Sequence, residues 1–447
     1  MADALFTSPV RVAILGCGNV GTALVELLSD PARAEAIELR SGTALEVVGI
    51  AVQDRDRRRS TEPWFPHHLL TTDAKGLVER DDVDVVVELM GGLDPAQELL
   101  EAALRAGRPV VTANKALLAR SGAELSELAA AHGVDLLYEA AVAGAIPVIR
   151  PLRESLAAER IVRVMGILNG TTNFILTKMA EDGSDYGDAL AEAQHLGLAE
   201  RDPSADVEGL DAAAKAAILA SLAFGAHVVA SDVHHEGITN VRAIDVAFAE
   251  QLGYVIKLLA VAELVGDGTE VSVRVHPAMV PRAHPLAMVG GAMNAVFVVG
   301  QASGELMLYG HGAGGRPTAS AVLGDLVDAA RHLRTETAAP APGRRMPVRF
   351  RPLDDLYSAY YISIDVADRP GVLASVARVF GDHGVSIRSM EQQGLGDEAR
   401  LVFLTHVARH GSVTATIDDL QRLNVVDRVG GVLRVIGAPA TPDLGGS

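Results

Sequence analysis

The chain has 447 residues, of which 49% are hydrophobic, and its formal net charge is -18. This length and composition fit a globular protein of two or three domains. An acidic chain repels nucleic acid and anionic membrane surfaces, so neither is expected as a partner. One cysteine excludes an intrachain disulfide framework, and no secretory signal or membrane-spanning stretch is recognisable, so a cytoplasmic location is predicted.

The first part of the chain alternates strand-like and helical patterns. A short β-type run at 10–15 leads into a glycine-rich turn and then into helical apolar spacing. Because the strands are almost continuously apolar, they predict a parallel sheet covered by helices on both faces, a Rossmann-type α/β fold. The further expected elements are strands at 45–52, 83–90, 108–114 and 134–140, and helices at 95–106 and 116–131.

The turn after the first strand carries Gly16, Gly18 and Gly21 in G-x-G-x-x-G spacing. Such spacing allows a tight turn, a close approach of backbone to pyrophosphate, and packing of the helix on the strand. The N-terminus of that helix, beginning at Asn19 and Val20, offers N–H groups to phosphate. Since the motif follows a strand and opens a helix, it predicts dinucleotide binding rather than an ordinary glycine turn.

The end of the second strand bears on the choice of dinucleotide. A carboxylate there would bind the ribose of NAD, whereas an arginine would accept the 2′-phosphate of NADP. Gln53, Asp54, Arg55 and Arg57 offer both kinds of group. The excess of arginine favours NADP, with Arg55 as a contact and NAD as the alternative.

The remaining chain divides into five further parts. Residues 141–310 predict an α+β substrate and dimerisation domain, with helices over about 171–225, a loop near 202, and strands such as 271–280 and 294–302. A glycine turn and helix at 311–335 are expected to pack back on the first domain, 1–140. Residues 336–357 are a Pro-, Ala- and Arg-rich linker, 358–438 read as a ferredoxin-like βαββαβ unit, and 439–447 form a flexible tail.

Residues 198–215 are rich in acidic side chains and run into an alanine-rich helix that holds Lys215. Asp211 precedes this lysine by four residues, so a helix places both on one side. A surface ion pair is one interpretation, but the apolar flanks favour burial of the lysine beside its carboxylate. Burial and neighbouring charges tune a lysine for proton transfer, and several carboxylates also suit a substrate ammonium. A divalent-metal interpretation of Asp202, Asp206 and Glu208 lacks the calcium-loop spacing.

A series of segments, taken in order, resembles the homoserine dehydrogenases. The resemblance covers essentially the whole chain and is closest to the bacterial monofunctional form with a C-terminal ACT domain. It implies NAD(P)H-dependent, reversible reduction of L-aspartate 4-semialdehyde to L-homoserine, on the route to threonine, isoleucine and methionine. The segments are GCGNVG, TANKAL, YEAAVAGAIPVI, GILNGTTNFIL, LAERDPSADVEGLDAAAK and GAGGRPTASAVLGD.

The resemblance also implies roles for particular residues. Lys215 matches the family's proton donor, and Lys115 matches a second catalytic lysine near nicotinamide and substrate. Glu200 and Asp211 match carboxylates that hold the substrate's amino group, with Asp211 also orienting the catalytic lysine. Asp206 belongs to the same cluster, and Thr171 matches a substrate or cofactor contact. The local pattern alone would make Thr171 a helix N-cap, and the two roles are compatible.

Two further sites rest on the resemblance alone. The segment EAAVAGAIP matches a loop that binds a monovalent cation, sodium, chiefly through backbone carbonyls of Glu139, Val142, Gly144 and Ile146. Without the resemblance, this segment would be an ordinary strand-to-helix turn. Met90, Gly314 and Gly315 match neighbours of the cofactor.

The C-terminal unit resembles ACT domains through DRPGVLASVARVFGDHGVSI at 368–387. Such domains pair with one another and bind small amino acids, so a homodimer or homotetramer is implied. We expect feedback inhibition by L-threonine through Asp368, Pro370 and Gly371. A dimerisation module without any ligand is the alternative.

Two rival functions are weighed against this interpretation. One is another Rossmann amino-acid dehydrogenase, which a comparison of aspartate semialdehyde with other carbonyl substrates would distinguish. The other is an amino-acid sensor in which the dinucleotide is only structural. The intact set of Lys115, Lys215, Glu200 and Asp211 speaks against the sensor.

Overall fold

The computed structural model describes residues 8–57, 64–339, 348–394 and 398–437. The chain folds into two compact units, each built from three stretches of sequence. The first unit contains Met1–Val164, Ala214–Val233 and Asn294–Pro347, and the second contains Met165–Ala213, His234–Met293 and Val348–Ser447. The predicted tail at 439–447 lies outside the described residues.

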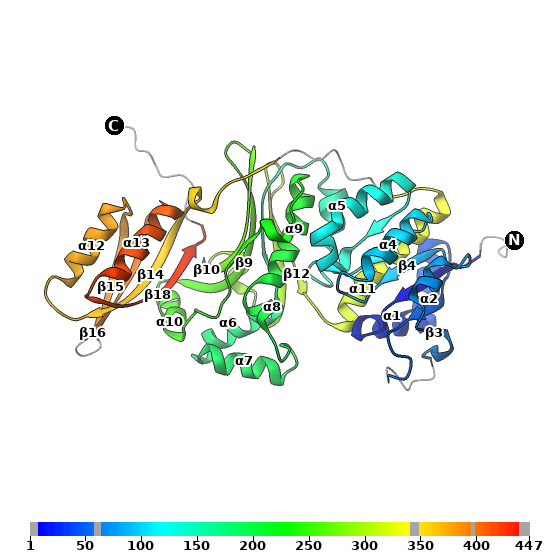
Figure 1. The fold of residues 1–447 in the computed structure, drawn as a ribbon, viewed down its shortest axis with the longest axis horizontal. Helices are drawn as coiled ribbons and strands as arrows, with labels where there is room; N and C mark the ends of the chain where they lie inside the picture. The colour runs from blue at the N-terminus through cyan, green and yellow to red at the C-terminus, as the bar shows by residue number, and fades with distance from the viewer. Residues whose placement is uncertain (1–7, 58–63, 340–347, 395–397, 438–447) are drawn as a thin grey trace. The chain divides into compact units, whose positions relative to one another are not determined.

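The first unit is built on a six-stranded parallel sheet with the strand order β3-β2-β1-β4-β5-β6. β3 and β4 of this sheet are labelled in Figure 1. This order reverses between β1 and β4, and ligands of such sheets bind beyond the carboxyl ends of the strands at this point. The predicted Rossmann-type fold is confirmed. The strands are β1 Val10–Leu15, β2 Leu45–Ala51, β3 Leu70–Thr71, β4 Val85–Glu88, β5 Val110–Thr112 and β6 Leu136–Leu137.

Helices follow the strands: the one after the glycine loop and those expected at 95–106, 116–131 and 311–335 are present, whereas the helices at Pro31–Ser41 and Ala74–Glu79 were not predicted. They are α1 Asn19–Ser29, α2 Pro31–Ser41, α3 Ala74–Glu79, α4 Ala96–Arg105, α5 Lys115–His132 and α11 Gly315–Thr335. Val322 and Leu326 of α11 are buried in one core with Ile14 of β1 and Leu24 of α1. The expected return of the 311–335 segment to the first domain is therefore confirmed.

The second unit begins with helices and continues into long strands. Its helices are α6 Gly170–Asp182, α7 Tyr186–His195, α8 Ser204–Val207 and α10 Ala243–Gln251, and its first strands are β8 His234–His235, β9 Tyr254–Val265 and β10 Glu270–Pro281. β9 and β10 pair antiparallel over their full lengths. Strands are predicted from the sequence in this region, but of this pair only β10 is among them.

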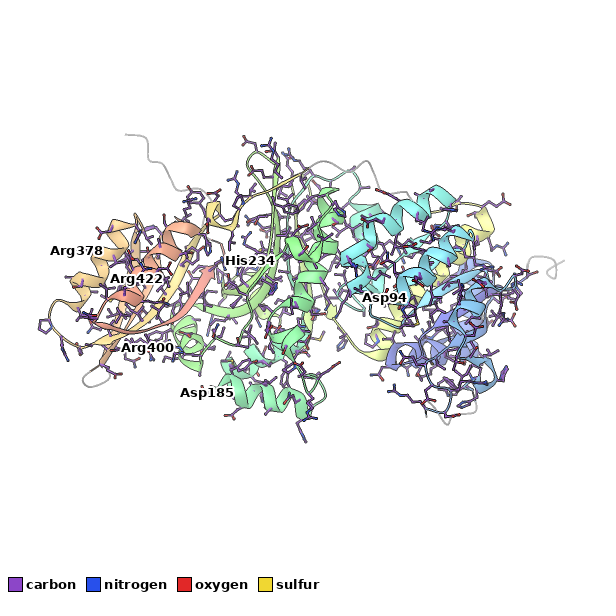
Figure 2. The ribbon with its side chains drawn as sticks, viewed as in Figure 1. Asp94, Asp185, His234, Arg378, Arg400 and Arg422 are labelled. Carbon is purple, nitrogen blue, oxygen red and sulfur yellow. The ribbon has the colours of Figure 1, made fainter. Side chains whose placement is uncertain are left out.

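The C-terminal βαββαβ unit is confirmed. Its elements are β14 Tyr357–Ala367, α12 Val372–Asp382, β15 Ile387–Gly394, β16 Glu398–Thr405, α13 His410–Arg422 and β18 Val426–Val435, with a short extra strand β17 Ala408–Arg409. Val376 and Phe380 of α12 and Leu420 of α13 are buried with Ile364 and Phe403 of the strands. Arg400 of β16, labelled in Figure 2, binds Asp365 of β14 through its Nε at 2.6 Å.

The compact units do not follow the domain ranges expected from sequence. β18 pairs in parallel with β10, opposing Ala278 to Arg434 and Met279 to Val435, so the C-terminal sheet continues into the β9–β10 pair. Four elements also cross or lie on the other side of the expected limits. They are α9 Leu210–Phe224, β7 Ile161–Ile167, β11 Met293–Gly300 and β12 Gly304–His311, of which β12 belongs to the first unit.

Among the described residues, no helix combines the length and the hydropathy that a bilayer crossing requires.

Candidate functional site

The glycine loop between β1 and α1 is shaped by two close backbone approaches. Gly16 has φ +98°, and a Cβ on it would lie 2.7 Å from the carbonyl carbon of Leu89. A Cβ on Gly21 would lie 2.4 Å from the carbonyl oxygen of Gly16. Gly18, which precedes the first residue of α1, has no such neighbour within 4 Å. Gly16 and Gly21 are therefore required by the turn itself, whereas the space at Gly18 is open to a ligand.

The predicted cofactor neighbours lie close together in the first unit. The backbone nitrogen of Met90 would be 2.8 Å from a Cβ on Gly16, and the carbonyl oxygen of Asn19 would be 3.0 Å from a Cβ on Gly315. Gly314, at φ +121°, is the N-cap residue of α11, which begins at Gly315. The N-termini of α1 and α11 thus meet near the carboxyl end of β1. Two sets of helix N–H groups at this point suit an anionic pyrophosphate.

A buried carboxylate that the sequence analysis missed shapes the neighbouring turn. Glu88, fully buried at the end of β4, accepts hydrogen bonds from the backbone nitrogens of Met90 at 2.8 Å and Gly91 at 3.0 Å. The hydroxyl of Thr112 donates to its other oxygen at 2.6 Å. A single acidic residue ending an apolar strand was the available signal. Glu88 therefore joins the ends of β4 and β5.

Lys115 is the first residue of α5, and its position is set by Asn114. The side chain of Asn114 accepts from the backbone nitrogen of Leu117 at 3.1 Å and donates to the carbonyl oxygen of Gly92 at 2.7 Å. An asparagine is well suited to this capping role because its short amide reaches the free N–H groups of the first turn. The segment TANK is thus a strand end, a cap and a helix start.

The loop after β2 carries the residues on which the preference for NADP over NAD was predicted, and that preference stays a prediction. Arg55 is exposed, and the side chain of Asp54 accepts from the backbone nitrogen of Asp56 at 2.8 Å. The neighbouring arginines of this loop at 58 and 59 lie outside the described residues.

In the second unit, the amide of Asn169 holds two of the predicted carboxylates together. Its Nδ2 donates to Asp206 Oδ1 at 2.7 Å and to Asp211 Oδ2 at 2.9 Å. Asp206 lies on α8 and Asp211 in the first turn of α9, so one amide joins two helices. Asn169 was not among the predicted site residues, although its place in the segment NGTTN gave a signal.

The expected N-cap at Thr171 is wrong. Asn169 caps α6 instead, with its Oδ1 accepting from the backbone nitrogen of Thr172 at 2.9 Å. Thr171 lies in the first turn, where its hydroxyl donates to the carbonyl oxygen of Leu198 at 2.7 Å. The cap therefore falls two residues earlier because an asparagine there binds both the helix start and the carboxylates.

The remaining acidic residues of the 198–215 segment have different surroundings. Glu200 is exposed, and its carboxylate accepts no hydrogen bond from the described part of the chain. Asp202 accepts from the backbone nitrogen of Ser204 at 3.1 Å and from its hydroxyl at 2.6 Å, and these bonds lower the pKa of Asp202. Across the described ranges, no three His, Cys, Asp or Glu side chains are placed to hold a metal ion.

Lys215 is buried, with 8% of its surface exposed, and Asp211 has the same exposed fraction. Both lie on α9, four residues apart, as predicted. The expectation of a buried lysine rather than a surface ion pair is confirmed for this part of the site.

The predicted cation loop is tightly packed in the first unit. The carboxylate of Glu139 accepts three backbone N–H bonds, from Val148, Ile149 and Arg150, at 2.5 to 2.9 Å. Its own backbone nitrogen donates to Asp325 Oδ2 at 2.8 Å. Burial raises the pKa of Asp325 to about 7, although this N–H group and the guanidinium of Arg150 oppose the rise.

Gly144 in this loop has φ +58°, and a Cβ there would lie 2.5 Å from the backbone of Gly312. The buried carbonyls of Val142, Gly144 and Ile146 accept no hydrogen bond from the residues that the structure describes. Buried carbonyls are normally satisfied, so these three are available to a ligand.

A cavity of about 580 Å³ lies elsewhere in the first unit, and none of the predicted site residues lines it. Its walls come from α5, the segment after β6 and the end of α9, including Arg120, Arg153 and His227. The predicted effector residues Asp368, Pro370 and Gly371 form an exposed turn between β14 and α12 in the second unit.

The chain matches three family models and closely similar proteins of known name. Residues 147–327 match the family model described as homoserine dehydrogenase, 16–139 match its NAD-binding domain, and 360–425 match the ACT domain. The homoserine dehydrogenase of Mycobacterium tuberculosis strain H37Rv is 50% identical over 438 residues, covering 96% of this chain and 98% of that protein. The Corynebacterium glutamicum homoserine dehydrogenase is 49% identical over 431 residues, covering 96% of each.

Solved structures agree with these relatives. A homoserine dehydrogenase crystal structure from Thiobacillus denitrificans superposes with a TM-score of 0.90 at 40% identity, covering 96% of this chain and 98% of that one. A hyperthermophilic archaeal homoserine dehydrogenase in complex with NADPH has a TM-score of 0.62 at 30% identity, covering 75% of this chain and all of the archaeal one.

Substitution of Gly21 by alanine is expected to weaken dinucleotide binding on the order of a hundredfold, because the added Cβ displaces the backbone of Gly16. Fluorescence titration with NADPH measures the dissociation constant. Gly18→Ala is the matched comparison, because its Cβ meets no protein atom. It should keep the unfolding temperature of the unsubstituted protein while weakening binding through contact with the ligand alone. Unchanged affinity in Gly21→Ala would contradict the assignment of the loop.

Proposed function

The chain belongs to the homoserine dehydrogenase family, and we propose that it reduces L-aspartate 4-semialdehyde reversibly to L-homoserine with NADPH as the preferred hydride donor. The pathways that it would serve are those to threonine, isoleucine and methionine. The single observation that carries the proposed substrate is the pair of carboxylates held by Asn169. Paired carboxylates favour an α-amino acid ammonium over an uncharged aldehyde.

The paired carboxylates support substrate binding in a specific way. The Asn169 amide uses both of its N–H groups, one on each carboxylate. The amide therefore has no further N–H group to donate to a ligand. Asp206 retains a second oxygen outside this pair of bonds. We assign this oxygen, Asp211 and the exposed carboxylate of Glu200 to the substrate's ammonium group. The hydroxyl of Thr171 donates to the carbonyl oxygen of Leu198, and we assign it as a further polar contact for the substrate or the cofactor.

Two lysines are assigned to the reaction. When bound, the nicotinamide supplies the hydride that reduces the aldehyde carbon. Lys215 gives a proton to the carbonyl oxygen, so the aldehyde becomes the alcohol and the lysine is left neutral. Asp211, one turn before it on α9, orients this lysine. Lys115 at the start of α5 is assigned to cofactor and substrate orientation.

Steady-state oxidation of L-homoserine tests the activity, measured with NAD and NADP in parallel. We expect a higher kcat/KM with NADP. Lys215→Ala should lower kcat by about 10²- to 10⁴-fold while the dissociation constant for NADPH changes little, because only proton transfer is lost. Lys178→Ala is the control, because this partly exposed lysine is paired with Asp182 and Glu192 and has no role assigned in the reaction. Retained turnover in Lys215→Ala would refute the assignment.

A monovalent cation, sodium, is proposed for the loop at 139–146. The unbonded carbonyls of Val142, Gly144 and Ile146 fit a hard cation, which prefers oxygen ligands. The buried amide of Asn294, which has no hydrogen-bond partner in the described residues, lies against Gly312 beside this loop. Because the Glu139 carboxylate is occupied by three N–H groups, its carbonyl rather than its side chain is the proposed ligand.

Gly144→Ala is expected to raise the sodium concentration for half-maximal activity roughly tenfold, because the Cβ meets the backbone of Gly312. Activity is measured with sodium chloride exchanged for choline chloride at constant ionic strength. Gly107→Ala carries a similar backbone strain at φ +73° but its Cβ has no neighbour within 4 Å, so its sodium dependence should match that of the unsubstituted protein. A sodium-independent unsubstituted enzyme would refute the cation site.

The ACT domain is proposed to bind L-threonine as a feedback inhibitor at the turn formed by Asp368, Pro370 and Gly371. This turn is exposed, and Gly371 at φ +90° precedes the free N–H groups of α12. These N–H groups suit the effector's carboxylate, and Asp368 suits its ammonium. ACT domains commonly pair at such elements, which supports a homodimer or homotetramer as the assembled state.

Asp368→Ala is expected to raise the threonine concentration for half-maximal inhibition roughly tenfold or more, because the effector's ammonium loses its counterion. The measurement is homoserine oxidation over a threonine titration. Asp382→Ala, at the other end of α12, is the control and should keep the inhibition curve unchanged. Activity of the unsubstituted enzyme that is indifferent to millimolar threonine would refute this effector.

A further inference from the structure

An ion pair between a buried arginine and a partly exposed glutamate joins the last strand of the ACT domain to the segment after β8. Arg434 on β18 has 5% of its surface exposed, and its Nη1 donates to Glu236 Oε1 at 2.7 Å. His234, labelled in Figure 2, lies with its Nε2 at 2.9 Å from the same oxygen. In the described part of the chain, Glu236 is the only carboxylate paired with Arg434. The side chain of Glu236 is therefore held by β18, while its backbone nitrogen donates to the carbonyl oxygen of Val275 on β10 at 2.8 Å.

The cost of losing this pair is high because Arg434 has few other contacts. Its Nη2 is buried without a hydrogen-bond partner in the described residues, and the Tyr360 ring lies 5.9 Å from its guanidinium carbon. A buried guanidinium without a counterion is strongly disfavoured. If Glu236 moved away from β18, the buried guanidinium of Arg434 would have no counterion.

The residues beside Glu236 are packed against the chain that carries the substrate carboxylates. The backbone nitrogen of Ile238 donates to the carbonyl oxygen of Val207 at 2.8 Å. A Cβ on Gly237 would lie 2.2 Å from that same oxygen, so the two backbones approach as closely as glycine allows. His235 Nδ1 lies 3.1 Å from the carbonyl oxygen of Glu208. A displacement of 236–238 would therefore displace 207–208.

Residues 207–208 directly follow Asp206 and precede Asp211 by only a few positions. We propose that Glu236 is a positioning residue: held by Arg434 of the ACT domain, it fixes the segment that carries Asp206 and Asp211 and so sets the affinity for the amino-acid substrate. The inference rests on the substrate role proposed above for these two carboxylates. The connection runs from β18 through one ion pair and one backbone contact to the site.

The test compares substrate KM values in the full-length enzyme. Glu236→Gln removes the charge and keeps the side-chain volume, and we expect the KM for L-homoserine to rise roughly tenfold while kcat and the KM for NADP stay unchanged. Arg434→Gln should have the same effect, and the double variant should add nothing further, because both residues act through one pair. A merely structural weakening would not separate the two KM values.

Two controls make the outcome specific. Glu270→Gln breaks a comparable ion pair, with Arg351, at the other end of β10, and should leave the KM for L-homoserine unchanged. Asp206→Asn tests the substrate role itself and should raise that KM. If Asp206→Asn has no effect, the proposed substrate site is wrong and the inference falls with it.

If Asp206→Asn raises the KM for L-homoserine and Glu236→Gln does not, the positioning role alone is overturned. A joint change of kcat and both KM values in Glu236→Gln would overturn it as well. Should Glu236→Gln fail to fold, Glu236→Asp carries the same test, because the shortened carboxylate must draw its backbone toward Arg434. An unchanged KM for L-homoserine in that variant would also refute the inference.

Discussion

The hydrogen bonds of one amide, that of Asn169, organise the second unit. Two carboxylates brought close together repel each other, and a neutral amide with two N–H donors removes much of this repulsion without adding a charge. The same side chain uses its oxygen to cap α6. Three helices therefore meet at one residue, and the substrate proposal depends on this arrangement. Replacing such an amide by a lysine would neutralise the negative charge that is proposed to bind the substrate's ammonium group.

In the first unit, backbone N–H groups rather than side chains are suited to bind the ligand. A bound dinucleotide presents its pyrophosphate to N–H groups, which are available only where the chain turns tightly into a helix. Gly16 and Gly21 allow that turn because no Cβ fits between the neighbouring backbones. Glu88 then fixes the adjoining turn by accepting its two N–H groups. Polar side chains thus stabilise the loops while glycines leave room for the ligand.

Features that depend on neighbouring residues in the chain could be predicted from the sequence. The alternation of strands and helices, the glycine loop and the burial of Lys215 all follow from periodicity and residue type. The cap of α6 was misplaced at Thr171 because several capping residues stand together in NGTTN, and only the contacts with Asp206 and Asp211 select Asn169. The pairing of β18 with β10 joins residues far apart in sequence, and strand patterns do not reveal such partners. Carbonyl ligands leave no side-chain signal at all.

Buried cations show why the chain places a carboxylate one turn before Lys215. Lys257 on β9 is equally buried but binds neutral oxygens, donating to Asn173 Oδ1 at 3.0 Å and to the Val289 carbonyl at 2.6 Å. Burial lowers the pKa of Lys257 to about 8, which a distant Glu181 only partly opposes. A carboxylate stabilises a buried ammonium more strongly than neutral oxygens do. The proton-donor role proposed for Lys215 therefore favours a lysine beside an aspartate, and α9 carries both, four residues apart.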